Sequence, residues 1–450
     1  MAIFDLNSTI VAVATPIGVG GISIVRLSGS DAVKIADKFF LSKTSKRPSK
    51  FKKRELVFGD FSGSLVSDEC LCVVFDSNSF TGEETVEFQA HGGIKIAELM
   101  VTECINAGAR LAKNGEFSLR AYLNGKMSVC EAEGMIDMIN AESDAELKAG
   151  HTLMKGGLTK KVEELQAKVI DLLSEVEVSF DYPEEDIEYI AENAIDEKVD
   201  GLISDIETLA NTYNAGAIIK NGINACLIGK PNVGKSSLLN SLLNREKAIV
   251  TNIAGTTRDV IEDAFEVNGI KVNILDTAGI RETKNIIEKM GVEKSISLIN
   301  QADIVLFIVD GTAPLDIQDA TILKFLQGKK YLTVYNKADK IKPSDRKKDG
   351  IYTSTKTGEG IEKLKSIIYD SIIGQNVVSG GLVITNSRHK ECLTRAKLAL
   401  ENARQNLKSQ TLDLIAVDLN EAYYCLGEIT GNTSNEAILD AIFSKFCLGK

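Results

Sequence analysis

The stretch GKPNVGKSSLLN, residues 229–240, decides the fold of the chain around it. It has the spacing GxxxxGKS, follows the apolar run ACLI and leads into the helical pattern SSLLNSLLN. A strand, a glycine-rich turn and a helix in this order place backbone N–H groups around phosphate oxygens, beside the positive end of the helix. We predict that Lys235 reaches the β- and γ-phosphates of a nucleotide and that the Ser236 hydroxyl binds Mg²⁺. The predicted contacts are Asn232, Val233, Gly234, Lys235, Ser236 and Ser237.

Two later motifs complete the predicted nucleotide site, and the second of them selects the base. The motif DTAG, residues 276–279, follows an apolar run, so we predict contacts from Asp276, Thr277, Ala278 and Gly279. In NKAD, residues 336–339, the Asp339 carboxylate can accept hydrogen bonds from guanine N1–H and the 2-amino group. Adenine offers neither donor and would leave the carboxylate unpaired. We also predict contacts from Asn336 and Lys337, and contacts to guanine O6 from the backbone N–H groups of Ser354, Thr355 and Lys356. Together the motifs predict a GTP-binding domain and disfavour an ATP-driven enzyme.

The residue that activates water is not obvious from the motifs. Many GTPases place Gln after DxxG, but here Ile280 stands there and cannot orient water. The residues alone leave Arg281, Glu282 and Glu288 as candidates. The segment GTTRD, residues 255–259, is predicted to be the nucleotide-dependent switch, because a threonine hydroxyl can join the Mg²⁺ shell. Arg258 within it is a candidate arginine finger.

Hydrophobic periodicity divides the rest of the chain. Residues 1–120 alternate short β-rich runs, at 9–14, 22–27, 56–61, 71–75 and 85–89, with a helix at 94–107. Near 122–215 and 388–445, apolar residues recur every three to four positions, which predicts helices. Between them, strand patterns at 224–228, 271–275, 304–310, 332–335 and 351–352 alternate with helices, which indicates a mostly parallel sheet. We predict an N-terminal α+β domain (1–120), a split helical domain (121–215 and 379–450) and an inserted α/β P-loop domain (216–378).

Composition excludes several classes of protein. The 450 residues suggest about three domains, and 44% hydrophobic with 26% charged residues excludes a disordered or fibrous chain. The net charge of −11 disfavours broad non-specific nucleic-acid binding. Residues 42–53 are the exception, with six Lys or Arg, and fit an exposed loop or, as the sharper alternative, a nucleic-acid contact.

Cysteine usage and targeting signals favour a cytoplasmic protein. The eight cysteines are scattered without a CxxC pair, which is typical of a reducing compartment. Cys70 and Cys72 are expected on one core-facing side of a strand. Three histidines far apart in sequence make a zinc site improbable. Neither a signal peptide nor a membrane span is expected.

Several stretches together resemble the MnmE (TrmE) family of tRNA-modifying GTPases along essentially the whole chain. They are SFTGEETVEFQAHGG (79–93), NGEFSLRAYLNGKMSVCEAEGMID (114–137), GKPNVGKSSLLN (229–240), GTTRD (255–259), DTAGIRE (276–282), NKAD (336–339) and FCLGK (446–450). The resemblance implies an N-terminal domain that binds folate and dimerises, with Arg26, Glu83, Lys126 and Lys450 as folate contacts. From the residues alone, Arg26 and Glu83 would be interpreted as ordinary surface charges.

The resemblance also implies a K⁺-dependent hydrolysis when two G domains pair. It implies that Ser236 and Thr257 are Mg²⁺ ligands, that Asn232, Thr251, Ile253 and Thr256 coordinate K⁺, and that Asn252, Ala254 and Gly255 complete the GTP contacts. Glu288 matches the glutamate that orients the attacking water, which favours it over Glu282. Cys447 matches the family's C-terminal cysteine and is a catalytic candidate; the alternative is a small apolar residue that docks the tail.

The function implied is modification of the wobble uridine (U34) of certain tRNAs at carbon 5. A cytoplasmic homodimer would work with an FAD-dependent partner, MnmG (GidA), in a heterotetramer or larger assembly. With a 5-formyl- or methylene-tetrahydrofolate one-carbon unit, the two would add an aminomethyl or carboxymethylaminomethyl group. The main alternative is a regulatory or ribosome-assembly GTPase without modification chemistry, although no basic GxxG-bearing segment follows the G domain.

Overall fold

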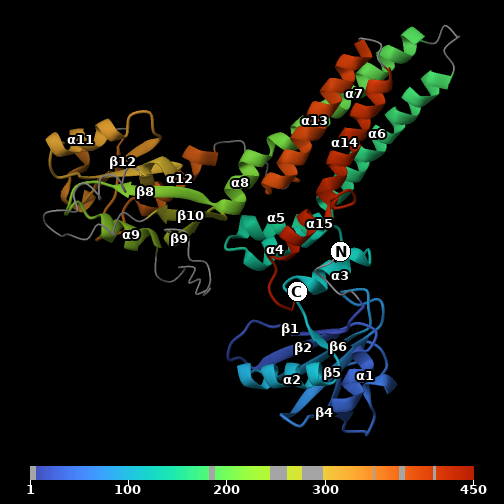
Figure 1. Ribbon diagram of the computed structural model, residues 1–450. Coiled ribbons are helices and arrows are strands. Elements are labelled where there is room, and N and C mark those ends of the chain that lie inside the picture. Colours follow the sequence, from blue (N-terminus) through green and yellow to red (C-terminus); the bar gives the residue numbers. More distant parts are fainter. Residues whose placement is uncertain are drawn as a thin grey trace. The chain divides into compact units, whose positions relative to one another are not determined.

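The computed structural model describes residues 7–181, 188–243, 261–275, 297–347, 350–373, 381–408 and 412–449 (Figure 1). They form two compact units. The first contains Met1–Ile136, Thr152–Ile203 and Cys392–Lys450, and the second contains Asp137–His151 and Ser204–Glu391. Each unit has its own sheet and its own hydrophobic core.

The first unit contains a seven-stranded sheet in the order β3-β4-β5-β6-β2-β1-β7. Its strands are β1 (Ile10–Val13), β2 (Ile22–Ser28), β3 (Phe40–Ser42), β4 (Val57–Ser62), β5 (Ser67–Phe75), β6 (Thr85–His91) and β7 (Arg110–Leu111). Neighbours pair antiparallel, except that β7 pairs parallel with β1. Each of the five predicted strands overlaps an observed one. Strands β3 and β7 were not predicted, because three and two residues are too few to show a period.

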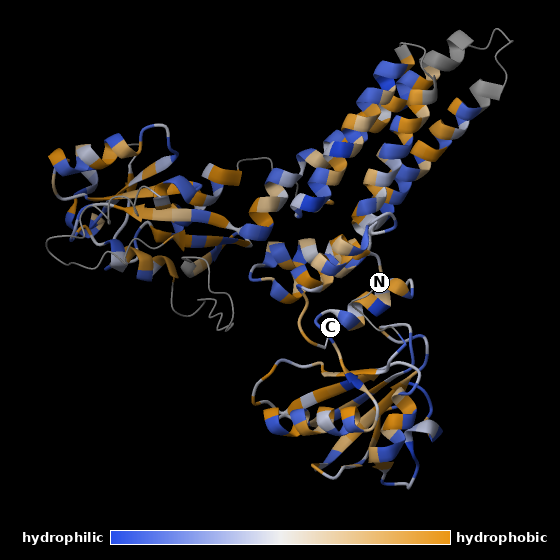
Figure 2. Ribbon diagram, viewed as in Figure 1, coloured by the Kyte–Doolittle hydropathy of each residue, from blue (hydrophilic) through white to orange (hydrophobic). Residues whose placement is uncertain are grey.

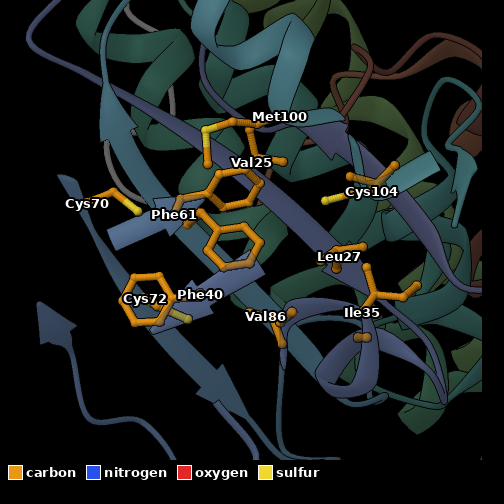
Figure 3. Packing of buried hydrophobic residues seen from close by; sticks show 14 of the residues in the cluster. Val25, Leu27, Ile35, Phe40, Phe61, Cys70, Cys72, Val86, Met100 and Cys104 are labelled. Carbon is orange, nitrogen blue, oxygen red and sulfur yellow. The ribbon is translucent and has the colours of Figure 1, made fainter. Parts of the chain in front are cut away.

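One face of this sheet holds the core that packs against α1 (Ala32–Phe39) and α2 (Ile94–Asn106). Val25 and Leu27 of β2 are fully buried there, and Cys70 and Cys72 of β5 join the same cluster (Figure 3). The prediction that both cysteines lie on one core-facing side is confirmed. Since side chains alternate along a strand, Arg26 and Ser28 of β2 belong to the opposite face.

Helices of different lengths make up most of the rest of the first unit. They are α3 (Glu116–Leu123), α6 (Gly157–Asp181), α14 (Leu412–Thr430) and α15 (Glu436–Phe443), with parts of α4 (Val129–Asn140), α5 (Asp144–Met154), α7 (Glu188–Asn211) and α13 (Ser387–Lys408). The apolar residues that give the predicted helical period are buried at Val162, Leu165, Val169, Leu172 and Val176 on α6, with Leu173 half-buried, and at Leu393, Ala396, Leu400, Ala403 and Leu407 on α13. Their spacing of three and four residues places each set on one helix face.

The second unit contains a six-stranded sheet in the order β13-β12-β11-β8-β10-β9. Its strands are β8 (Ile223–Ile228), β9 (Ile261–Val267), β10 (Ile270–Leu275), β11 (Ile304–Asp310), β12 (Tyr331–Asn336) and β13 (Ile351–Tyr352). The helices are α8 (Tyr213–Asn221), α9 (Lys235–Leu243), α11 (Ile317–Phe325) and α12 (Ile361–Ile373). Every pair is parallel except β9 with β10. The predicted parallel sheet is therefore confirmed.

Alternate residues of β11 enter two different clusters, one on each face of this sheet. Figure 2 shows its central strands coloured mostly as hydrophobic, as expected when both faces are covered. Strand β9, which was not predicted, lies at the edge of the sheet. Among its residues 264–267, the buried ones are Phe265 and Val267, which share one face. Its sequence IEDAFEV mixes acidic residues with apolar ones, which hid the strand from a search for apolar runs.

Within the described residues, none of the helices is both long and apolar enough to cross a lipid bilayer.

Candidate functional site

The predicted phosphate loop connects the end of β8 at Ile228 to the start of α9 at Lys235. Gly234 has a φ of 94°, and a Cβ there would lie 2.3 Å from Asn336 Nδ2. A Cβ at Gly229 would lie 2.2 Å from the carbonyl oxygen of Ile308. Both positions therefore require glycine. The loop closes tightly against β11 and β12, as the spacing of the motif predicts.

Lys235 is a half-buried cation held by carbonyl oxygens. Its Nζ donates to the carbonyl oxygens of Gly229 and Lys230, both at 2.7 Å. Burial lowers the pKa of this lysine. Carbonyl oxygens only partly offset the lost hydration of an ammonium group, so an incoming anion gains a strong charge-assisted contact here. The residues present thus fit a nucleotide phosphate.

The predicted base-recognition motif is bonded directly to the phosphate loop. Asn336, at the end of β12, is buried, and its Nδ2 donates to the carbonyl oxygen of Val233 at 2.9 Å. Lys337 donates from Nζ to the Asn232 carbonyl oxygen at 3.1 Å and to Asp310 Oδ2 at 2.6 Å. The two motifs, about a hundred residues apart in sequence, therefore form one site.

The Asp339 carboxylate is exposed, and a hydrogen bond from a buried serine fixes its orientation. Buried Ser354 donates from Oγ to Asp339 Oδ1 at 2.7 Å, and this hydrogen bond lowers the pKa of the carboxylate. Nearby, Ala338 N–H donates to the Thr353 carbonyl oxygen at 3.0 Å, which joins the two loops. Thr355 is half-buried and Lys356 is exposed beside this carboxylate. An ionised, exposed acceptor fits the donor edge of guanine.

An ion pair that was not predicted anchors the phosphate loop. Lys230 Nζ lies 2.7 Å from Asp316 Oδ2 and 2.8 Å from Asp319 Oδ2 at the start of α11. Asp319 is buried, and Asp316 caps the helix. Because the Lys230 carbonyl oxygen accepts from Lys235, this ion pair positions the lysine of the site. Lys230 occupies a position of the GxxxxGKS motif that accepts any residue. Its sequence position therefore does not indicate the contact with Asp316 and Asp319.

A second polar site lies in the first unit around Glu83. This carboxylate accepts hydrogen bonds from Ser28 Oγ at 2.7 Å and from Arg120 Nη1 at 3.0 Å. Arg120 is 1% exposed and also donates to Glu116, which is fully buried. Burial opposes ionisation of Glu116, but hydrogen bonds led by Arg110 lower its pKa overall. Glu83 therefore belongs to a fixed network and is not an ordinary surface charge.

Arg26 and Lys126 lie near this network. Arg26 Nε donates to Glu87 at 2.7 Å, and its guanidinium lies 5.8 Å from the Phe80 ring and 5.7 Å from the Phe117 ring. Its Nη1 also donates to the carbonyl oxygen of Gly449 at 3.4 Å. Lys126 is exposed, and a Cβ added at Gly82 would lie 3.2 Å from its Cε. The structure thus brings Arg26, Glu83 and Lys126 to one region, near the C-terminal tail.

Arg120 and Ser28 were missed as parts of this region. Glu116 and Arg120 are four residues apart, and i and i+4 side chains meet on a helix such as α3. A helix predicted at this position could have identified the arginine, but none was predicted there. Cys447 is exposed, unlike the other seven cysteines, which are buried.

Several predicted site residues lie outside the described part of the chain. They are Thr251, Asn252, Ile253, Ala254, Gly255, Thr256, Thr257, Asp276, Thr277, Ala278, Gly279, Glu288 and Lys450. Their assignments stay predictions.

Known protein families and individual relatives match this chain over nearly its whole length. The family model "MnmE helical domain" matches residues 129–447, and "GTP-binding protein TrmE N-terminus" matches residues 9–126. A tRNA modification GTPase MnmE of Carboxydothermus hydrogenoformans is 40% identical, with 99% of this chain and 100% of the relative covered. The protein of the same name from Clostridioides difficile gives the same values, and that of Acetivibrio thermocellus is 39% identical over 99% of both chains.

Proposed function

Since this chain belongs to the MnmE family of tRNA modification GTPases, we propose that it hydrolyses GTP in the course of tRNA modification. One observation carries the GTPase part of the proposal. The Asp339 carboxylate, fixed by Ser354, and the Lys235 ammonium belong to a single site joined by the Asn336–Val233 hydrogen bond. A cation for phosphates and a guanine-selective acceptor, held on one scaffold, match the two ends of GTP.

The selectivity follows from hydrogen-bond chemistry. Asp339 is exposed and its pKa is lowered, so it is an ionised acceptor at neutral pH. Guanine supplies two donors to such a carboxylate, whereas adenine would desolvate it without compensation. Backbone N–H groups at Ser354, Thr355 and Lys356 would bind guanine O6. The base therefore orients the nucleotide, and the triphosphate meets Lys235.

Hydrolysis requires charge stabilisation and an oriented water. Ser236 and Thr257 would hold Mg²⁺, and Asn232, Thr251, Ile253 and Thr256 would hold K⁺. These cations would neutralise charge on the phosphates. Lys235 would bind the β- and γ-phosphates, with Asp276, Thr277, Ala278 and Gly279 beside them. Glu288 would orient the attacking water, the task that Ile280 cannot perform.

The region around Glu83 would take the folate. Arg26, Lys126 and Lys450 would face the anionic glutamate tail or the polar edges of the pterin. Glu83, held by Ser28 and Arg120, would accept from pterin N–H donors. Folate would supply a one-carbon unit, with Cys447, exposed near the chain end, as a candidate catalytic group.

The complete reaction would need a partner. We propose a cytoplasmic homodimer that acts with an FAD-dependent MnmG (GidA) subunit, in a heterotetramer or larger assembly. Its product would carry an aminomethyl or carboxymethylaminomethyl group on C5 of U34. The functional domains would be residues 1–120 for folate and dimerisation, 121–215 with 379–450 for the helical frame, and 216–378 for GTP.

The test is a reconstituted reaction. The chain, its suspected partner, unmodified tRNA, GTP, Mg²⁺, K⁺, FAD and a reduced folate are combined, and the tRNA nucleosides are analysed by mass. We expect a C5-modified uridine that requires GTP. GTP hydrolysis stimulated by RNA, with no folate affinity and no modified nucleoside, would favour the regulatory GTPase instead.

A further inference from the structure

We propose that the basic segment, residues 43–54, together with the exposed ring of Phe58, binds the RNA substrate of this chain through phosphates and a stacked base. The inference rests on the proposed function, because it names the surface that the tRNA would contact.

The basic segment stands out from an acidic chain. The whole sequence has a net charge of −11, yet KTSKRPSKFKKR, residues 43–54, contains seven Lys or Arg and neither Asp nor Glu. All seven cationic residues are exposed. They are Lys43, Lys46, Arg47, Lys50, Lys52, Lys53 and Arg54. A local concentration of exposed cations attracts a phosphate backbone even on an acidic protein.

Three of these cations meet carboxylates. Lys43 pairs with Asp60 and Glu69, Lys53 with Glu84 and Arg54 with Asp76, at 2.6 to 3.5 Å. Within the described ranges, Lys46, Arg47, Lys50 and Lys52 have no carboxylate oxygen within 4.0 Å of their charged nitrogens. The Asp37 carboxylate nearby accepts instead from the Ser49 N–H at 2.8 Å. Four cations thus remain for an anionic ligand.

The segment is a fixed structure. Phe51 belongs to the core of the sheet, and Pro48 is buried at the start of a 3₁₀ turn, Pro48–Lys50. Arg47 Nη1 donates to the carbonyl oxygen of Asp37 at 2.8 Å. Ser45 and Arg54 have φ values of 61° and 64°, which non-glycine residues rarely adopt. Such backbone persists only where the surroundings impose it and is frequent at binding sites.

Phe58 supplies an apolar platform beside Lys43, the first cation of the segment. It lies on β4, which pairs with β3 next to the basic segment, and its side chain is 50% exposed. Lys43 Nζ lies 5.4 Å from the centroid of its ring. An exposed aromatic ring next to a basic segment is a combination that binds unpaired nucleotides, because every base has a face that can stack. An acidic protein surface would use the cations but would gain little from the ring, so we favour RNA.

The position of the basic segment suits a substrate of the Glu83 region. Arg54 Nη2 donates to the carbonyl oxygen of Asn78 at 2.9 Å, and Lys53 pairs with Glu84, the neighbour of Glu83 in sequence. The end of the segment therefore contacts the loop that carries Glu83. An RNA bound along the segment would present nucleotides close to the proposed one-carbon donor.

The test measures tRNA affinity of the full chain at several KCl concentrations, by fluorescence anisotropy with an unmodified tRNA transcript. The variant K46Q/K50Q/K52Q removes three unneutralised cations. Its matched control, K95Q/K155Q/K160Q, removes three exposed lysines elsewhere in the same unit. We expect the first variant to bind about tenfold more weakly at low salt, and its slope of log affinity against log salt to fall by about 2 to 3. The control should match the wild type.

F58A separates stacking from charge. We expect the F58A variant to bind tRNA at least about fivefold more weakly than the wild type. Its slope of log affinity against log salt should be unchanged, because stacking releases no counterions. GTP affinity and thermal unfolding should be unchanged in all three variants, which shows that each is folded.

Equal tRNA affinity and salt slope for wild type and K46Q/K50Q/K52Q would overturn the inference while leaving the proposed function intact. Weaker binding of polyglutamate with unchanged tRNA binding would assign the segment to an acidic protein partner and overturn it as well. A wild-type chain that binds no tRNA, and forms no modified nucleoside with its partner, would overturn the proposed function together with the inference.

Discussion

Asn336 donates a hydrogen bond from Nδ2 to the carbonyl oxygen of Val233 at 2.9 Å, although 103 residues separate the two in sequence. The first residue lies where β12 ends and the second within the phosphate loop after β8. The bond therefore sets the distance between the two ends of the nucleotide site. It also explains why a buried amide stands at the first position of NKAD.

Replacing Asn336 with Ala should weaken both the fold and the site. The buried Val233 carbonyl oxygen would lose its donor, which costs about 1–3 kcal/mol in free energy of unfolding. GDP affinity should fall as well, because the phosphate loop loses its link to the base loop. Urea unfolding and calorimetric GDP titration measure the two effects. Asn420→Ala, an exposed amide on α14, is the control, and equal losses in both variants would contradict the assignment.

Replacing Lys230 with Met should destabilise the second unit, because Asp319 would stay buried without its cation. GDP affinity should also decrease, since the Lys230 carbonyl oxygen helps hold Lys235. Adding Asp319→Asn should restore part of the stability, and chemical unfolding measures it. Strictly additive losses in the double variant would show that the two side chains are not coupled.

The pair of Asp310 and Lys337 predicts a dependence of stability on pH. Burial opposes ionisation of Asp310, but the hydrogen bonds from Lys337 and Thr312 together outweigh it and bring the pKa to about 2, below the ordinary 3.8. The contribution is therefore present above about pH 4 and is lost as pH falls toward 2. Allowing for solvent screening, we expect about 1 kcal/mol. Unfolding of wild type and Asp310→Asn at several pH values should give stability differences that shrink below pH 4; a constant difference would contradict this.

Glu288→Ala should leave GTP affinity nearly unchanged and slow hydrolysis by about 10²-fold or more, the usual range for a group that activates water. Glu282→Ala, at the other acidic candidate, is the matched control. Phosphate release at saturating GTP measures the difference. A large loss of affinity on changing Glu288, or a comparable slowing on changing Glu282, would remove Glu288 from its proposed role.

Local sequence patterns predicted most of the fold and the core of the nucleotide site. The phosphate loop was predictable because strand, glycine turn and helix are contiguous, and the apolar stripe of α13 because its period is regular. In these cases the signal lies within a few residues.

Other features depend on contacts that no local pattern encodes. The pairing of Lys230 with Asp319 joins residues far apart in sequence, and each alone looks like a surface charge. Arg26 pairs with Glu87 only because of the register between β2 and β6. The acidic residues of the edge strand β9 hid it from a search for apolar runs.

The central claim is that Asp339 selects guanine while Lys235 binds the phosphates in one site. Calorimetric titration of GDP, ADP and XDP into wild type and Asp339→Asn tests it most directly. We predict that the wild type binds GDP and neither ADP nor XDP measurably, and that the variant loses GDP and gains XDP, because the amide donates to the additional carbonyl oxygen of xanthine. Equal affinity of the wild type for ADP and GDP, or an Asp339→Asn variant that still prefers GDP, would contradict the account.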